Sequence, residues 1–250
     1  MAKIPYALQL YTVRDHIAKD FAGTLKKVKE VGYDYIELAG LGGVSAAECK
    51  KILDQVKLTA ISNHVGYEEM IQKTDEVIAM CRTLNIRFIV VPWLGKPFAT
   101  DKASWIKCAQ ALDAAGTKLK AAGIRLCYHN HAHEFEKFDG EYALDILYAN
   151  SSPDHVAGQL DTYWLKHGGV DPVAYIRKYS GRCPLIHVKD MSAGEPHTFA
   201  EVGRGILDWK AIFGAGNAAG AQWYIVEQDT CPGDSLESAR ISAEFMAKQK

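Results

Sequence analysis

The chain has 250 residues, of which 48% are hydrophobic and 24% are charged, a composition typical of a folded globular protein. Its 29 basic residues nearly balance its 30 acidic residues, which disfavours nucleic acid as a partner because nucleic-acid binders usually carry a basic excess. No apolar stretch approaches the roughly 20 residues that cross a membrane, and the six cysteines are scattered, as free thiols are in reducing compartments. We therefore expect a cytoplasmic protein that binds neither nucleic acid nor membrane.

Short apolar runs, rich in β-branched and aromatic residues, alternate along the chain with longer amphipathic stretches. In chain order, the expected strands are Tyr6–Leu10, Tyr35–Leu38, Leu58–Asn63, Phe88–Pro92, Ile124–His129, Val156–Asp161, Leu185–Val188 and Trp223–Glu227. The stretches between them have helical periodicity, as from Phe21 to Val31 before the stop signal Gly32. Between Gln9 and Glu227, successive strand ends follow one another at steps of 26 to 40 residues, which is the spacing of repeated β–α units.

This alternation predicts an α/β protein, a single (β/α)8 TIM barrel formed by residues 1–250 as one domain. Continuous apolar strands are typical of a parallel sheet that is covered on both faces. The alternative is an open doubly wound sheet, but Gln9-Leu10-Tyr11-Thr12 follows the first strand where a glycine-rich phosphate loop would be expected. In TIM barrels the active site lies at the C-terminal ends of the strands, so candidate functional residues are expected there.

Three predicted strands in succession end in a potential metal ligand. Asp161, His187 and Glu227 should converge at the barrel mouth, where carboxylate and imidazole groups suit one divalent ion. We expect Mn²⁺, with Co²⁺, Zn²⁺ and Mg²⁺ as alternatives. His129 at the end of the fifth strand and Glu134 in the following loop are alternatives for the fourth ligand. Without a metal, Asp161 would cap the next helix and His187 would be a core histidine with satisfied hydrogen bonds.

Other residues near the same strand ends are candidates for proton transfer. Lys189 lies two residues after a predicted ligand and is expected either to face the pocket, where it would stabilise a developing oxyanion or act as an acid, or to be solvated. His131 shares the strand face of His129, so both can point into the barrel. His64 is a candidate proton shuttle or a ligand of a sugar hydroxyl, unless it is merely structural.

We expect substrate contacts from Gln9 at the end of the first strand and from Trp93 and Trp164, whose rings can support the apolar face of a sugar. Arg204, within Gly203-Arg204-Gly205, either contacts an anionic group of the substrate or faces solvent in a tight turn. The sequence contains no Gly-x-Ser-x-Gly elbow, so covalent serine catalysis has no support.

Several segments together resemble the sugar phosphate isomerase/epimerase family, which belongs to the xylose isomerase-like TIM-barrel superfamily. These segments are Leu8-Gln-Leu-Tyr-Thr-Val-Arg14, Tyr128-His-Asn-His-Ala-His-Glu-Phe135, Leu160-Asp-Thr-Tyr-Trp164, Gly168-Gly-Val-Asp-Pro172, His187-Val-Lys-Asp190, Gly203-Arg-Gly-Ile-Leu-Asp-Trp209 and Ile225-Val-Glu-Gln-Asp229. The resemblance covers essentially the whole chain. Its motifs are specific for the family but are poor guides to the substrate.

The resemblance implies one divalent ion held by a Glu/Asp/His/Glu set, of which Asp161, His187 and Glu227 correspond to the last three. His129 stands where many relatives have the first glutamate, and His131 stands where some relatives place an acid/base histidine. The implied activity is isomerisation or epimerisation of a ketose, keto-sugar or sugar phosphate through a metal-stabilised enediolate, with Glu227 or His131 as the base. The His-Asn-His form also looks like members that act on keto-sugars or inososes by elimination, so a dehydratase or lyase is the alternative.

Two further classes remain as rivals. A sugar-binding barrel without catalytic activity would have no need of a Lewis acid. A nuclease of the endonuclease IV type shares this barrel but uses a trinuclear zinc cluster with many more ligands, and the balanced charge of this chain disfavours it. The expected partner is therefore a small sugar or sugar-derived substrate, and a homo-oligomer is left open.

Overall fold

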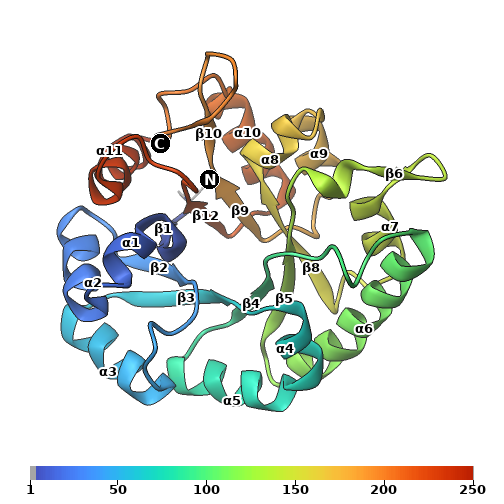
Figure 1. The fold of residues 1–250 in the computed structure, drawn as a ribbon, viewed down its shortest axis with the longest axis horizontal. Coiled ribbons are helices and arrows are strands. Elements are labelled where there is room, and N and C mark those ends of the chain that lie inside the picture. Colours follow the sequence, from blue (N-terminus) through green and yellow to red (C-terminus); the bar gives the residue numbers. More distant parts are fainter. Residues whose placement is uncertain (1–3, 250) are drawn as a thin grey trace.

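The computed structural model describes residues 4–249, which form a closed barrel of parallel strands surrounded by helices (Figure 1). The barrel strands are β1 (Tyr6–Gln9), β2 (Tyr35–Leu38), β3 (Thr59–His64), β4 (Phe88–Val91), β5 (Arg125–His129), β8 (Val156–Asp161), β9 (Leu185–Val188) and β12 (Trp223–Val226). The last strand pairs with the first, with Val226 opposite Leu8. This closure confirms the expected (β/α)8 TIM barrel. It rules out the open doubly wound sheet, whose edge strands would not meet.

Helices cover the outside of the barrel on all sides (Figure 1). They are α1 (Arg14–Ile17), α2 (Phe21–Glu30), α3 (Ala46–Val56), α4 (Tyr67–Gln72), α5 (Thr74–Leu84), α6 (Lys102–Ala121), α7 (Ala143–Ala149), α8 (Thr162–His167), α9 (Pro172–Lys178), α10 (Trp209–Ala219) and α11 (Ser235–Ala247). Several begin at an aspartate whose carboxylate accepts a backbone N–H, as Asp101 does for α6 and Asp171 for α9. Within residues 4–249, we find no helix with the length and apolar character needed to span a membrane.

Short elements of secondary structure lie in the loops that follow three of the barrel strands. They are the 3-10 turns η1 (Leu10–Val13) and η2 (His133–Phe135), and the two-residue strands β6 (Lys137–Phe138), β7 (Glu141–Tyr142), β10 (Asp190–Met191) and β11 (Phe199–Ala200). Each pair of short strands forms a small antiparallel hairpin outside the barrel sheet. These insertions lengthen the loops at the C-terminal ends of β5 and β9.

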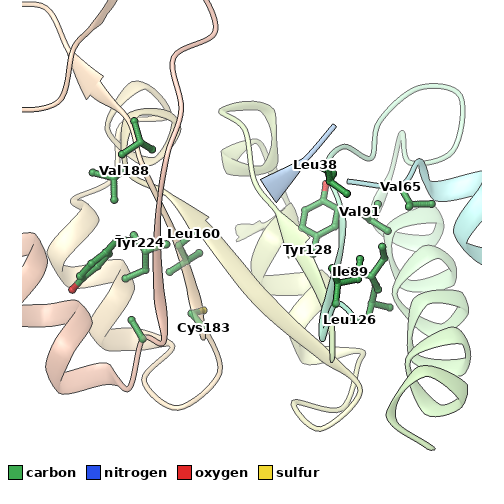
Figure 2. Close-up of a cluster of buried hydrophobic side chains, with 14 of the residues drawn as sticks. Leu38, Val65, Ile89, Val91, Leu126, Tyr128, Leu160, Cys183, Val188 and Tyr224 are labelled. Atoms are coloured by element: carbon green, nitrogen blue, oxygen red, sulfur yellow. The ribbon is translucent and has the colours of Figure 1, made fainter. Parts of the chain in front are cut away.

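The larger core lies between the barrel and the helices (Figure 2). Outward-facing side chains such as Leu38, Ile89 and Leu160 are completely buried there. Burying one such side chain contributes about 1.5–3 kcal/mol, so this layer dominates the stability of the fold.

The inward-facing side chains of the same strands change character along the barrel axis. Near its base they are apolar and form a second core of Ala7, Ile61, Phe88, Val90, Cys127, Ala157, Leu185 and Ile225. Two residues further along five of these strands, the same face carries Gln9, His129, Gln159, His187 and Glu227. Because side chains alternate with a period of two, this change places a polar layer at the C-terminal end of the barrel.

A buried aspartate organises the loop after β9. The Asp190 carboxylate accepts hydrogen bonds from the backbone N–H groups of Gly203 and Gly205 at 2.9 and 3.0 Å. It also accepts one from the indole N–H of Trp209 at 2.7 Å. The Gly203–Trp209 motif is therefore built around an internal carboxylate.

We expect Gly205→Ala to destabilise this loop. A Cβ at residue 205 would lie 2.2 Å from both Asp190 Oδ1 and the Met191 carbonyl oxygen, so the backbone must shift. Such overpacking costs about 1–3 kcal/mol in free energy of unfolding, which urea denaturation would measure. Gly214→Ala in α10 is the matched control because nothing lies within 4 Å of the added Cβ, and it should stabilise the protein by up to about 1 kcal/mol. Equal free energies of unfolding for Gly205→Ala and the wild type would contradict the inference that residue 205 is tightly packed against Asp190 and Met191.

Candidate active site and metal centre

A cavity of about 370 Å³ opens at the mouth of the barrel. Its lining consists of Tyr11, Ala39, His64, Pro92, Trp93, His129, His131, Lys189, Glu227 and Asp229. This volume falls in the range of about 300–1,000 Å³ that is usual for small-molecule sites. The four residues predicted to be catalytic, His64, His131, Lys189 and Glu227, thus border one cavity.

Four side chains from neighbouring strand ends form a candidate metal centre at the floor of this cavity. His129, Asp161, His187 and Glu227 each offer one ligand atom, and these atoms all lie within 4.8 Å of one another. His187 Nδ1 is 2.9 Å from Glu227 Oε2 and 3.9 Å from Asp161 Oδ2. His129 Nε2 is also 3.9 Å from Asp161 Oδ2. All four side chains are buried, so a cation held there would be shielded from water.

The chemistry of this group fits a divalent ion. Two imidazole nitrogens and two carboxylates suit Mn²⁺, Co²⁺ or Zn²⁺. Asp161 Oδ2 is buried and accepts no hydrogen bond, which suits an oxygen that ligates a cation. The ammonium of Lys189 already lies 3.2 Å from this oxygen and 2.8 Å from Glu227 Oε2. An incoming ion must therefore share these two carboxylates with Lys189.

Glu134, the other candidate for the fourth ligand, lies elsewhere. Its carboxylate accepts a hydrogen bond from the Tyr128 hydroxyl at 2.6 Å and one from the His131 backbone N–H at 2.8 Å. It is not part of the four-residue group, which His129 completes. The η2 turn points Glu134 back toward the outer face of β5, and the carboxylate there anchors the loop that carries His131.

Lys189 is almost completely buried and faces three carboxylates. Besides Asp161 and Glu227, it donates a hydrogen bond to Asp229 Oδ1 at 2.9 Å. Burial lowers the pKa of Lys189, but these three negative charges outweigh burial and raise the pKa above its ordinary value. The lysine is therefore a fixed cation in the cavity wall, and the solvated alternative is wrong. Asp229 shares the strand parity of Glu227 but was not among the predicted site residues.

His131 lies beside the metal centre with one free ring nitrogen. Its ring is 5.0 Å from that of His129 and 5.2 Å from that of Trp164, centroid to centroid. The Nδ1 atom is buried without a hydrogen-bond partner. Burial, followed by the charge of Lys189, lowers the pKa of His131 to about 3. The imidazole is therefore neutral at physiological pH.

Beneath the cavity lies a buried carboxylate, Glu37, which the sequence analysis did not assign to the site. Burial alone would raise its pKa, but His64 and His187 hold the pKa of Glu37 well below its ordinary value. His64 Nε2 lies 3.0 Å from Glu37 Oε1, while the rest of the His64 ring borders the cavity. The available signal was the position of Glu37 at the end of a barrel strand, like that of the predicted ligands.

The structure places only some of the residues expected to bind substrate at the cavity. Trp93 borders the cavity and is 43% exposed at its rim. Trp164 packs behind His131, 5.2 Å away between ring centroids. Gln9 is completely buried and donates to Glu37, so it lies below the cavity. Arg204 borders a separate surface depression with Phe245, which makes the expectation of an anion contact at the active site wrong.

Comparisons with known proteins agree with this geometry. An inosose dehydratase from Geobacillus thermodenitrificans (strain NG80-2) is 26% identical over 154 residues, which cover 55% of this chain and 51% of that protein. The chain therefore spans about half the length of this curated relative. The crystal structure of a sugar phosphate isomerase/epimerase from Parabacteroides distasonis ATCC 8503 is 25% identical, with a TM-score of 0.84 over 99% of this chain and 95% of that chain.

A structure of the IOLI protein with a bound zinc atom shares the fold, with a TM-score of 0.75 at 17% identity over 98% of this chain and 96% of that chain. A family model described as a xylose isomerase-like TIM barrel matches residues 25–249. The closed parallel barrel and the ligand group at its mouth are in keeping with this match. The chain belongs to the xylose isomerase-like TIM barrel family.

Proposed function

We propose that this protein is a divalent-metal-dependent enzyme that isomerises or epimerises a keto-sugar by removing a proton from the carbon next to its carbonyl group. One observation carries this proposal: a four-residue ligand group, a neutral histidine and a buried ammonium surround a single cavity. The names of the relatives support it, since sugar isomerisation and the dehydration of a keto-sugar both begin with loss of such a proton.

His129, Asp161, His187 and Glu227 would hold the ion. We expect Mn²⁺, with Co²⁺, Zn²⁺ and Mg²⁺ as alternatives, and the zinc in the IOLI structure supports a metal in this family. When bound, the ion supplies a Lewis acid that polarises the carbonyl and makes the adjacent C–H bond more acidic.

His131 is our candidate for the base. The C–H bond would break, the proton would move to the His131 imidazole, and the electron pair would form the C=C bond of an enediolate as the carbonyl π electrons move to oxygen. Return of the proton to the neighbouring carbon isomerises the sugar, whereas protonation of the opposite face of the same carbon epimerises it. Lys189 and His64 would stabilise the developing oxyanion or transfer protons to and from the substrate hydroxyl groups. Lys189 and His187 hold the pKa of Glu227 low despite its burial, so Glu227 suits the role of ligand better than that of base.

A second candidate function is dehydration of a keto-sugar or inosose. The names of the curated relatives favour it, and so does Lys189, whose ammonium borders the cavity. After His131 takes the proton, it would pass this proton to a hydroxyl on the next carbon, to which the Lys189 ammonium would donate a hydrogen bond. The C–O bond then breaks and water leaves. Both candidates share the first step, so they differ only in the fate of the enediolate.

We expect an unphosphorylated substrate. Asp161, Glu227 and Asp229 are the three carboxylates around Lys189, and together they balance this ammonium plus one divalent ion. Arg14 is the cation near the rim, but its guanidinium donates to the backbone carbonyls of Tyr11 and Asp229. A phosphate dianion would thus find no excess positive charge. We predict that kcat/KM for a free keto-sugar exceeds that for its phosphate at least about tenfold, equivalent to about 1.4 kcal/mol, and faster turnover of the phosphate would contradict this prediction.

The proposed function is tested by metal analysis and hydrogen exchange. Metal content would be measured in the purified protein, and activity would be assayed with Mn²⁺, Co²⁺, Mg²⁺ and Zn²⁺ on ketoses, keto-sugars and inososes in D₂O. We expect one ion per chain and deuterium at the carbon next to the carbonyl, and the product distinguishes an isomerase or epimerase from a dehydratase. A protein that takes up none of these ions and exchanges no deuterium would overturn the proposal in favour of a sugar-binding barrel.

A further inference from the structure

Glu37 is a carboxylate surrounded only by hydrogen-bond donors. Its Oε1 accepts from Gln9 Nε2 at 2.8 Å and from His187 Nε2 at 2.6 Å, and it lies 3.0 Å from His64 Nε2. Its Oε2 accepts from Ser62 Oγ at 2.6 Å and from Gln159 Nε2 at 2.7 Å. The side chain is completely buried, so no water competes for these contacts. An ionised carboxylate can only accept hydrogen bonds, and it therefore dictates that each neighbour presents a hydrogen.

The first consequence concerns His187. Its Nε2 must carry the hydrogen that Glu37 Oε1 accepts. The other ring nitrogen, Nδ1, faces Glu227 Oε2 at 2.9 Å and Asp161 Oδ2 at 3.9 Å. Once a cation replaces the hydrogen on Nδ1, Glu37 still holds the hydrogen on Nε2. This is the carboxylate–histidine–metal arrangement that orients imidazole ligands.

The second consequence concerns His129, which Glu37 reaches through an amide. Gln159 donates one Nε2 hydrogen to Glu37 Oε2, so its Oε1 must point the other way. That oxygen lies 3.1 Å from His129 Nδ1. The Nδ1 atom of His129 must therefore carry a hydrogen, which leaves a lone pair on Nε2, the nitrogen 3.9 Å from Asp161 Oδ2.

We infer that Glu37 is the positioning residue of the metal centre, because it sets the tautomers of both imidazole ligands, His187 directly and His129 through Gln159. The inference rests on the proposed metal-dependent function and deepens it. Glu37 does not line the cavity, and it contacts neither Asp161 nor Glu227. It acts on the metal centre through the imidazole rings of His187 and His129. It also accounts for a histidine at residue 129, since an imidazole ligand there needs an oriented acceptor for its Nδ1 hydrogen, and Gln159 Oε1 provides it.

The test compares Zn²⁺ affinity, measured by competition with a chromogenic chelator, among three variants of the full chain. Glu37→Gln replaces an accepting oxygen by an NH₂ group that faces other hydrogen-bond donors. We expect the Zn²⁺ affinity to fall about 10–100-fold. Gln159→Leu breaks the link from Glu37 to His129, together with the contact between Gln159 and His64, but leaves the contact between Glu37 and His187, and we expect a loss in the same range. Ser62→Ala is the matched control, because Ser62 contacts Glu37 and neither imidazole ligand, so its affinity should change by less than about tenfold.

A second measurement reads the tautomers and needs no variant. Two-bond ¹H–¹⁵N spectra of the Zn²⁺-loaded wild type should show a hydrogen on Nε2 of His187 and on Nδ1 of His129. The reverse tautomer at either ring would overturn the inference even if Glu37→Gln does not fold. Unchanged Zn²⁺ affinity in both Glu37→Gln and Gln159→Leu would also overturn it. A wild type that binds no divalent ion would instead refute the proposed function itself, so the two failures are distinct.

Discussion

Asp161→Asn is expected to abolish metal retention and turnover together. The substitution removes the negative charge at Oδ2, a buried ligand oxygen that accepts no hydrogen bond and lies 3.2 Å from the Lys189 ammonium. We expect kcat/KM to fall at least about 10³-fold, which corresponds to about 4 kcal/mol of transition-state stabilisation. Metal content and deuterium exchange of the same preparation would measure both losses.

The Asp161→Asn variant should remain folded. Asp161 also caps α8, with Oδ1 accepting the Trp164 backbone N–H at 2.8 Å, and asparagine caps helices equally well. Burial raises the pKa of Asp161 to about 6, so a neutral side chain removes an electrostatic cost from the metal-free protein. Asp171→Asn is the matched control, because Asp171 caps α9 in the same way but lies away from the cavity. Full metal content and activity in Asp161→Asn would refute the metal centre.

His131→Asn is expected to separate catalysis from metal binding. Loss of the base should lower kcat about 10²–10⁴-fold, the usual contribution of a positioned proton acceptor. Metal content should be unchanged, because His131 is not part of the four-residue ligand group. Deuterium exchange into substrate should fall in parallel with kcat, since both depend on the same proton transfer.

His133→Asn provides the comparison for this variant. His133 lies two residues away on the same loop, but its Nε2 donates to the Leu94 carbonyl at 2.6 Å and its ring faces Trp93 at the rim. We expect no comparable loss of kcat in this variant. Equal losses in both variants would show that the loop conformation, rather than the His131 ring nitrogen, limits turnover, and would refute the role of His131 as base.

Much of the site was predictable because parallel barrels obey two simple rules. Strand ends converge at one mouth, and side chains of one parity share one face. Asp161, His187 and Glu227 follow from these rules, and the structure brings their ligand atoms together with one from His129. Lys189 follows the same parity into the cavity.

Loop residues were less predictable, because no periodicity governs their direction. Glu134 and Arg204 both follow a strand end closely enough to reach the mouth, yet each lies elsewhere. The Tyr128 hydroxyl and the His131 backbone N–H hold the Glu134 carboxylate away from the ligand group. The five hydrogens around Asp190 bind the segment that contains Arg204 into a compact loop outside the cavity.

The amino-acid sequence by itself determined the barrel, its strands and the end of the barrel where the polar residues gather, because these depend on local periodicity and strand spacing. Only the tertiary structure decided which polar residues act on one another. Glu37 and His187 are 150 positions apart, and their 2.6 Å contact exists because closure of the barrel brings β2 and β9 across the same interior. Hydrogen-bond partners across a barrel depend on register and closure, which no single segment encodes.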